Sequence, residues 1–442
     1  MTGRKRGLAQ LAKFSLLTAT AYAPLVHAQT VPTAPTPVIE ATPTNSTSPQ
    51  PLRETEPRSV TERQEQRDRE IGVSALGLLL MPQATADLAL NSNVFAEASG
   101  QSDAVLTVAA RMRAESEWAR HLLRLDLSAD RTQYFKFTSE NATQARALAD
   151  GRIDLASGFT LSPTLQAAWL VEPRTSIGAP ILAGSPVRYR NFGGSLDGQW
   201  SGARATITVG GGVSRYRYDD ALVAGVTVSQ ANRDFTQSAL HVRGGYDLGA
   251  GRQVYVNVER DWLDYRLGAV GGTSRNSNGW QVTGGLSSEI TPLLHGRIGL
   301  GYISQHYANS AARPVSALGF DVALDWYATE LTTVHAVALR RFEGGSSGDL
   351  YGYLSTRVSI KADHEWSRAL IFSAGAAVEF AGFRSIDRTD RQLALEFGAR
   401  YQLDRNIFIK GRASLLKRSS SGAARVFDYT QAVGGAQLGY QF

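Results

Sequence analysis

FDYTQAVGGAQLGYQF, residues 427–442, closes the chain and alternates apolar with polar side chains at a period of two residues. Successive side chains of an extended strand point to opposite faces, so this stretch has two different faces. The apolar face holds Ala432, Ala436, Leu438, Tyr440 and Phe442, and the polar face holds Gln431, Gln437 and Gln441. The stretch therefore predicts a β-strand that separates an oily environment from a wet one.

The same alternation recurs from Thr85 onward in one segment after another. Around Leu393 the apolar set is Leu393, Leu395, Phe397, Ala399, Tyr401 and Leu403, opposite Gln392, Glu396, Arg400 and Gln402. Segments 318–327 and 354–366 show the same separation. A charge on a lipid-facing surface near the bilayer midplane costs about 2–4 kcal/mol. Charged residues avoid the apolar face in these segments, as a lipid-facing surface requires.

Alternation alone does not distinguish a soluble β-sandwich from a membrane barrel, because the strands of both have one apolar and one polar face. Three further features favour the barrel. The predicted strands run about 10 to 16 residues, longer than usual for soluble sheets and long enough to cross a bilayer when tilted. Aromatic residues gather at the strand ends, as an interfacial girdle requires. Short and long connections take turns along the chain.

The two classes of connection give the number of strands. We expect tight turns near Trp118–Arg120, Ser162–Pro163, Ser201–Gly202, Gly249–Gly251, Thr291–Pro292, Thr329–Leu331, Ser367–Arg368 and Asp404–Arg405. Looser polar loops lie between them, at 97–102, 136–142, 173–186, 220–233, 268–275, 309–314, 344–348, 385–388 and 419–425. Short turns on one side and longer loops on the other are typical of outer-membrane barrels, and this pattern implies about 18 strands, with 16 or 20 as alternatives.

Strands can cross hydrocarbon only as a closed ring, because each unpaired backbone group there costs several kcal/mol. The predicted fold class is therefore all-β: a transmembrane antiparallel up-and-down β-barrel over residues 85–442, with both chain ends in the periplasm. An outer membrane of a Gram-negative bacterium is the expected location.

The first residues predict export. MTGRKRGLAQLAK contains four basic residues and no acid, a mostly apolar stretch follows from Phe14, and Val26-His27-Ala28 ends it with small side chains. This order is typical of a secretory signal peptide at residues 1–28, with cleavage after Ala28. The apolar part is shorter than the 20 or so residues that a membrane-spanning helix needs.

Two segments separate this signal from the barrel. Residues 29–70 are Pro/Thr-rich and then almost wholly polar, which predicts a disordered periplasmic extension whose end has the composition of a short polar helix when bound. Residues 71–84 form a lead-in segment with an apolar stretch ending at Pro82. This segment is either an extended approach to the barrel or a piece tucked into its lumen.

Composition excludes several other classes of protein. The chain has no Cys, which excludes a lipid-anchored cysteine and thiolate metal sites. After Ala28 no run of 18 apolar residues occurs, so no transmembrane helix is predicted. Four basic residues leave with the signal, so the mature chain is nearly balanced in charge and the sequence pI of about 9.5 is no sign of nucleic-acid binding. We expect no cofactor and no nucleic-acid partner.

From about Ile71 to its end the chain resembles the outer-membrane β-barrel porin type 2 family. The resemblance rests on residues 91–95 (NSNVF), 216–220 (YRYDD), 331–334 (LTTV), 356–359 (TRVS), 363–365 (DHE), 386–391 (IDRTDR) and 403–406 (LDRN). It implies an outer-membrane barrel, an association with exopolysaccharide production and export, and no catalytic residues. Tyr440-Gln441-Phe442 is similar to the aromatic C-terminus that serves barrels as an insertion signal, which implies the barrel-assembly machinery as a partner.

The polar face is the expected functional surface, since a ring of 18 strands leaves an aqueous channel unless something plugs it. Candidate pore-lining residues are Arg111, Arg113, Asp126, Arg243, Asp247, Glu259, Asp321, Arg357, Lys361, Glu396, Arg400 and Arg412. A strongly ion-selective pore would show rings of one sign, whereas this set mixes signs and favours uncharged or weakly charged solutes. The alternative is that these residues pair across the lumen and only satisfy one another.

A second candidate site consists of tyrosines near the outer mouth. By the same alternation Tyr216, Tyr218, Tyr351, Tyr353 and Tyr429 point inward, where their flat faces suit the apolar face of a sugar ring. The alternative is that a β-bulge shifts the phase and these residues belong to the aromatic girdle.

An enzymatic function has little support in the sequence. Gly344-Gly345-Ser346-Ser347-Gly348 has the spelling of a nucleophile elbow, but that motif needs a strand-to-helix turn and this one lies in a predicted hairpin loop. No paired-histidine metal motif is present, so neither catalytic nor metal-binding residues are predicted. The sequence favours a passive or accessory pore linked to exopolysaccharide secretion. A barrel-embedded hydrolase and a structural or adhesive barrel with a closed lumen are the alternatives.

Overall fold

The computed structural model describes residues 58–155, 158–177, 184–223, 225–267, 274–309, 312–344 and 351–442. The predicted signal peptide and most of the predicted extension, residues 1–57, lie outside the described residues. So does most of the loop that carries the nucleophile-elbow spelling.

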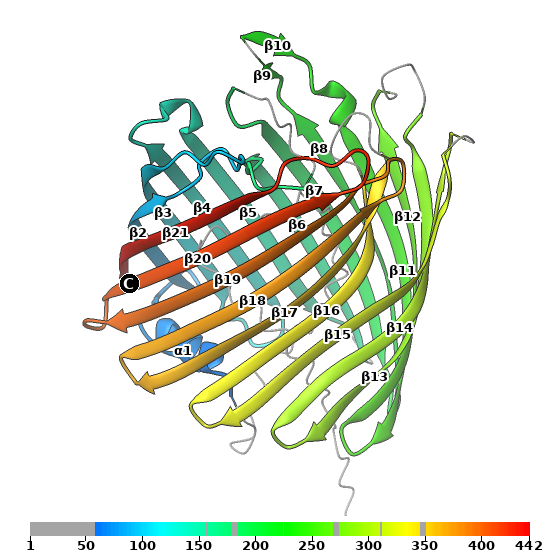
Figure 1. Cartoon of the computed structure of the whole chain (residues 1–442). Coiled ribbons are helices and arrows are strands. Elements are labelled where there is room, and N and C mark those ends of the chain that lie inside the picture. The colour runs from blue at the N-terminus through cyan, green and yellow to red at the C-terminus, as the bar shows by residue number, and fades with distance from the viewer. Residues whose placement is uncertain are drawn as a thin grey trace, which may run out of the picture.

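Eighteen antiparallel strands form one closed ring (Figure 1). They are β2 (Leu78–Asn91), β3 (Asp103–Ser116), β4 (Leu122–Tyr134), β5 (Ala142–Asp154), β6 (Phe159–Val171), β7 (Arg188–Ser201), β8 (Ala205–Tyr218), β11 (Phe235–Gly249), β12 (Arg252–Tyr265), β13 (Ser277–Thr291), β14 (Leu294–Tyr307), β15 (Val315–Thr329), β16 (Thr332–Gly344), β17 (Gly352–Ser367), β18 (Leu370–Phe383), β19 (Thr389–Gln402), β20 (Ile407–Ser421) and β21 (Tyr429–Gln441). The ring closes where β2 pairs with β21, from Gln83 opposite Gln441 to Asn91 opposite Val433. The predicted barrel with about 18 strands is confirmed.

Tight turns and longer loops alternate around the ring, so each class lies at one end of the barrel. We call these the turn end and the loop end. In Figure 1 the loop end is at the top, where the short strands β9 (Ala221–Val223) and β10 (Val226–Val228) extend one loop. The 3-10 turn η2 (Ala231–Arg233) lies in the same loop, and η1 (Thr138–Glu140) lies in the loop between β4 and β5.

One predicted turn is wrong. Pro163 lies inside β6, opposite Leu196 of β7, and not in a connection. The chain reverses direction a few residues earlier, where the Leu155 amide donates to the Phe159 carbonyl at 2.9 Å. Proline removes a ladder donor, and the ladder between β5 and β6 is indeed interrupted beside it. The proline therefore interrupts pairing without ending the strand.

The outward faces of the strands are apolar. Leu438, Leu393 and Phe397 are exposed, whereas their polar neighbours Gln437 and Gln392 are 5% and 2% exposed. This arrangement is the reverse of a soluble sandwich, because oily side chains face outward and amides face the enclosed lumen. The lipid-facing set predicted from the alternation is therefore confirmed in these strands.

The segment before the ring matches one sequence alternative and differs from one boundary. The end of the extension, predicted as disordered or as a short polar helix when bound, forms the helix α1 (Val60–Arg69) against the barrel wall. The ring begins at Leu78, earlier than the predicted start at Thr85, and β1 (Val73–Ala75) folds back on β2. Pro82 is tolerated inside β2 because pairing with β21 starts only at Gln83, so its missing amide breaks no bond of that ladder.

Local sequence explains where α1 begins. Ser59 accepts a hydrogen bond from the Glu62 amide, and the Glu62 side chain accepts one from the Ser59 amide, which together form a capping box. Glu62 lies in the first turn and Arg67 and Arg69 in the last, as the helix dipole favours. Among the described residues, no helix is both long enough and apolar enough to cross a membrane.

Candidate functional site

The candidate pore-lining residues all lie on the lumen side of their strands, and many of them pair with a neighbour. Arg111 forms an ion pair with Asp126, and Arg297 Nη2 lies 3.0 Å from Asp321. Further pairs join Arg357 to Glu379 at 3.7 Å, Lys361 to Asp363 at 2.9 Å and Arg412 to Asp87 at 2.5 Å. Much of this set is therefore paired as the alternative expects, but the pairs run along the wall between nearby strands and not across the lumen. Whether these residues contact a solute remains a prediction.

The other members of the set have more local surroundings. The Arg243 guanidinium lies over the Tyr255 ring at 4.0 Å, and the Asp247 carboxylate accepts from the Gly249 amide at 2.8 Å in the turn after β11. Glu259 faces the lumen beside Asp261. Six of the twelve, Arg111, Arg113, Lys361, Glu396, Arg400 and Arg412, line one cavity beside α1.

Helix α1 lies within the lumen at the turn end and is anchored at both of its ends (Figure 1). Arg63 and Arg67 reach Glu365 of β17 at 2.9 and 3.0 Å, and Glu365 is 5% exposed. Arg69 reaches Glu115 of β3 at 2.6 Å. Charge-assisted hydrogen bonds of this length are the strong ones. The helix therefore bridges the lumen from β17 to β3.

The N-terminal end of α1 is also buried. Val60 is 1% exposed, and its amide donates to Thr333 Oγ1 of β16 at 3.1 Å. This bond satisfies one of the amides that the start of a helix leaves without a partner. A buried apolar side chain and a buried amide bond hold this end against the barrel wall.

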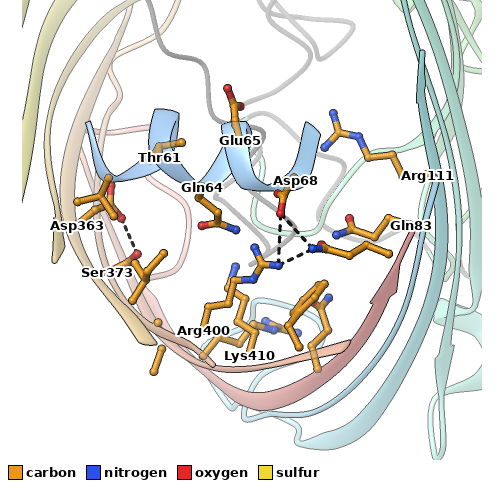
Figure 2. Close-up of a pocket in the computed structure, with 18 of the residues that line it drawn as sticks. Thr61, Gln64, Glu65, Asp68, Gln83, Arg111, Asp363, Ser373, Arg400 and Lys410 are labelled. Atoms are coloured by element: carbon orange, nitrogen blue, oxygen red, sulfur yellow. Dashed lines mark hydrogen bonds and ion pairs between the residues drawn. The ribbon is translucent and has the colours of Figure 1, made fainter. Parts of the chain in front are cut away.

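The acidic residues of α1 are held less firmly. The Asp68 carboxylate accepts from Gln441 Nε2 at 3.1 Å, lies 4.0 Å from Arg400 Nη2, and points toward the wall in Figure 2. Glu65 lies 3.9 Å from Arg113. Burial raises the pKa of both carboxyls, and the nearby arginines lower it by less than burial raises it. Their charges are therefore incompletely compensated.

A cavity of about 240 Å³ separates α1 from the barrel wall (Figure 2). Its wall side is built from β2, β3 and β17–β21, and its helix side from Gln64, Glu65 and Asp68. The charged lining consists of six basic residues, Arg111, Arg113, Lys361, Arg400, Lys410 and Arg412, and four acidic ones, Glu65, Asp68, Asp363 and Glu396. Basic side chains are therefore in excess.

A second element crosses the lumen at the loop end. Residues 172–177, which follow β6, contact the strands on the far side of the ring. The Thr175 carbonyl accepts from Gln392 Nε2 of β19 at 2.9 Å and from the Tyr429 hydroxyl of β21 at 3.3 Å. Ile177 is fully buried against Tyr353 of β17.

Ion pairs fix the base of this crossing segment. Glu172 Oε1 lies 2.6 Å from Arg233 Nη2, and both side chains are about 2% exposed or less. Arg174 reaches Glu140 at 2.6 Å. Burial raises the pKa of Glu172, while the adjacent carboxylate of Glu172 raises the pKa of Arg233 against its own burial. A pair with so little exposed surface ties the segment to two neighbouring loops.

The five tyrosines do not form an exposed track. Tyr216 and Tyr218 are buried in an aromatic cluster with Tyr189, Phe235 and Tyr265. Tyr353 packs under Ile177, Tyr429 packs against Ala96 and Leu416, and Tyr351 binds Asn309 at 2.7 Å. The alternation predicts inward directions, but it contains no information about loops that fold over those side chains. The expectation of open stacking faces is wrong in this conformation for the four that are buried.

Sequence reasoning missed α1 and residues 172–177 as parts of the site. A signal existed for the helix, because Ser59-Val60-Thr61-Glu62 has the spelling of a capping box. None existed for the crossing segment, whose partners on the far wall, Gln392 and Tyr429, lie more than 200 positions away in sequence. Within the described residues, no group of three or more His, Asp or Glu side chains gathers in a way that would hold a metal ion.

Several solved outer-membrane structures are similar to this chain. OccK2 (OpdF) of Pseudomonas aeruginosa is 10% identical with a TM-score of 0.44, over 83% of this chain and 97% of that one. OccAB4 of Acinetobacter baumannii is also 10% identical with a TM-score of 0.44, over 82% and 98%. The ferric enterobactin receptor PfeA of Pseudomonas aeruginosa is 8% identical with a TM-score of 0.40, over 82% and 80%.

No curated protein sequence matches the chain. One family model does match, and it covers residues 70–442, which include the lead-in segment and the complete ring of strands. The resemblance expected from the sequence is thereby confirmed: this chain, an outer-membrane β-barrel of the porin type, belongs to the family described as "Putative beta-barrel porin 2".

Proposed function

We propose that this protein is a passive outer-membrane channel whose passage is narrowed at the turn end by α1 and at the loop end by residues 172–177. The observation that carries the proposal is that both elements lie inside the ring and are bound to its wall. The Thr175 carbonyl bonds to Gln392 across the lumen, and Arg67 bonds to Glu365 at the other end. An open 18-strand ring would otherwise pass solutes with little regard to size.

The paired charges along the wall support a channel without strong ion preference. Rings of one sign would create such a preference. Here Arg111, Arg357 and Lys361 each have an acidic neighbour on the lumen face. The channel therefore selects mainly by size and by local contacts with the two narrowing elements.

The proposal also assigns a direction to the barrel. Short turns face the periplasm in outer-membrane barrels, so the turn end, α1 and both termini face the periplasm after removal of residues 1–28. Tyr440 and Phe442, which are 46% and 48% exposed, then present an aromatic C-terminus to the barrel-assembly machinery. Protease protection in intact and permeabilised cells tests this direction.

A disulfide lock tests the channel. The chain has no native Cys, so the pair Val60→Cys and Thr333→Cys introduces the only thiols, at positions already in contact. We expect the purified protein to conduct ions in planar bilayers, and conductance to rise when the disulfide is reduced and α1 is released. The two single-cysteine variants are the controls. A folded barrel without conductance in either state would refute the channel.

The link to exopolysaccharide secretion rests on the family resemblance alone. The two narrowing elements favour an accessory role over passage of the polymer itself, since both must move before a chain can pass. Deletion of the gene followed by measurement of secreted polysaccharide tests the link, and an unchanged polymer yield would remove it. Hydrolysis assays on lipid and casein test the alternative of a barrel-embedded enzyme, for which we expect no turnover.

A further inference from the structure

We propose that the cavity between α1 and the barrel wall binds a small dicarboxylate, and that Glu65 and Asp68 of α1 take the place of its carboxylates when the site is empty. The inference rests on the proposed channel function, because the cavity lies on its lumen. It adds the class of solute and the contact with which that solute competes.

Among the residues of the barrel wall that line the cavity, basic side chains outnumber acidic ones. Arg111 and Arg412 are paired with Asp126 and Asp87. Within the described part of the chain, Arg400 donates to two neutral acceptors, Gln402 Oε1 at 2.9 Å and Gln441 Oε1 at 3.1 Å, and its side chain is 13% exposed. Its Nε is buried and has no hydrogen-bond partner among the described residues.

Arg400 and Lys410 together form the basic centre of the site. They lie directly opposite each other on β19 and β20, and both line the cavity. Figure 2 shows both side chains beneath α1. Adjacent cations at low exposure repel each other, so an anion between them removes that repulsion and gains a charge-assisted bond.

Small residues provide the space that a solute would fill. Gly375 of β18 and Gly398 of β19 also line the cavity, on the wall beside these basic residues. A Cβ added at Gly375 would meet no atom closer than 3.7 Å, and one at Gly398 none closer than 3.8 Å. An added methyl group would therefore make ordinary van der Waals contacts at these positions without a clash. A short carbon skeleton fits against this surface while its charged ends reach the basic residues.

Asp68 of α1 already lies beside the basic centre and Glu65 lies near Arg113, but neither carboxylate binds its cation closely. The anchoring arginines of the helix form bonds of 2.6 to 3.0 Å. Asp68 and Glu65 lie 4.0 and 3.9 Å from Arg400 and Arg113. Fixed to a helix that is anchored elsewhere, these carboxylates cannot approach their cations more closely. A free carboxylate has no such constraint and displaces them.

Binding of succinate to the detergent-solubilised full-length mature protein tests the site by calorimetry. We expect succinate to bind, and the neutral succinamide and the cationic 1,4-diaminobutane not to bind. Arg400→Gln with Lys410→Gln should weaken succinate binding at least about tenfold, since two charged contacts are lost. The matched control is Arg124→Gln, a lumen-side base of β4 that pairs with Asp150 and does not line the cavity.

Heat-modifiable migration on gels shows whether each variant is folded. If the double variant fails to fold, Lys410→Arg is the second variant, because it keeps the positive charge at this position. Lys410→Arg should retain binding within a few-fold. Equal binding of succinate and succinamide, or full binding by the folded Arg400→Gln variant, would overturn the site.

The oxidised Val60→Cys/Thr333→Cys protein tests the competition. With α1 held in place, we expect succinate to bind about tenfold more weakly than after reduction, because the tethered helix keeps the competing carboxylates of Glu65 and Asp68 beside the basic residues of the wall. The Glu65→Gln/Asp68→Asn variant should bind more tightly than the wild type. Equal affinity in the oxidised and reduced states would overturn the competition. If the protein conducts ions but binds no succinate, the proposed site is refuted and the channel function is not. If it binds succinate but never conducts ions, the channel function is refuted and the site is not.

Discussion

The carbonyl of Thr175 accepts a hydrogen bond from Gln392 Nε2 at 2.9 Å, although 217 positions separate the two residues. Thr175 follows β6, and Gln392 lies in β19 on the far side of the ring. This bond, with that from Tyr429, holds residues 172–177 across the lumen at the loop end. Helix α1 does the same at the turn end through Glu365 and Glu115. The passage is therefore narrowed by two elements that contact the wall independently.

Removing both bonds to Thr175 should widen the loop end. Gln392→Ala with Tyr429→Phe removes two hydrogen bonds, each worth about 0.5–1.5 kcal/mol. We expect higher single-channel conductance and entry of larger sugars in liposome-swelling assays. Ser359→Ala, on the lumen face of β17 six residues beyond Tyr353, is the control. Unchanged size exclusion in a folded barrel would contradict a narrowing role for this segment.

Neutralising Glu365 should loosen α1. Glu365→Gln weakens the bonds from Arg63 and Arg67, which are partly exposed, so we expect a loss of about 1–2 kcal/mol in docking. The rate at which a thiol reagent labels a Val60→Cys background should then rise roughly tenfold, as 1.4 kcal/mol corresponds to a factor of ten. Glu117→Gln, an exposed acid of the turn after β3, should leave the rate unchanged. An equal rise in both variants would argue against a specific anchor.

A charge should be tolerated on one face of β17 and not on the other. Val358 is 45% exposed on the outward face near the middle of the strand, and its neighbour Ser359 faces the lumen. We expect Val358→Arg to lower the free energy of unfolding in lipid by about 2–4 kcal/mol and Ser359→Arg by much less. Urea titration in lipid vesicles measures both. Equal losses would contradict the assignment of the two faces.

The carboxyls of α1 predict a pH dependence. Burial raises the pKa of Glu65 and Asp68 in the docked helix, so their protonated forms favour docking. Their contribution is present at low pH and is lost as pH rises from the ordinary values of 4.5 and 3.8 through the raised ones. Conductance should therefore increase from pH 4 to pH 7.

The variant Glu65→Gln/Asp68→Asn isolates this effect. Every other titratable group of the lumen is present in both proteins, so its contribution cancels in the comparison. We expect the variant to lack the part of the pH dependence that these two carboxyls cause. Parallel pH profiles for wild type and variant would exclude them as its source.

Alternation of side chains, together with strand length, aromatic strand ends and two alternating classes of connection, determined the barrel from the sequence. In an extended strand the direction of each side chain follows from its position, so Gln437 and Leu438 had to face opposite environments, and lipid outside requires a closed ring of strands. The turn at Ser162–Pro163 failed because a proline interrupts one ladder without ending its strand. The end of the extension was predicted as disordered because its polar residues bury almost no apolar surface unless they pack against the barrel wall.

What fills the lumen was decided only by the tertiary structure. The two-residue periodicity predicts that Tyr353 and Glu365 point into the lumen, but it does not predict which residues contact them there. Ile177 covers the first and Arg63 and Arg67 bind the second, and these partners come from segments without periodicity of their own. Contacts between residues so far apart in sequence form only when the closed ring brings them to a common lumen. Local sequence therefore determines the barrel wall of this protein. Long-range contacts determine the shape of the passage through its lumen.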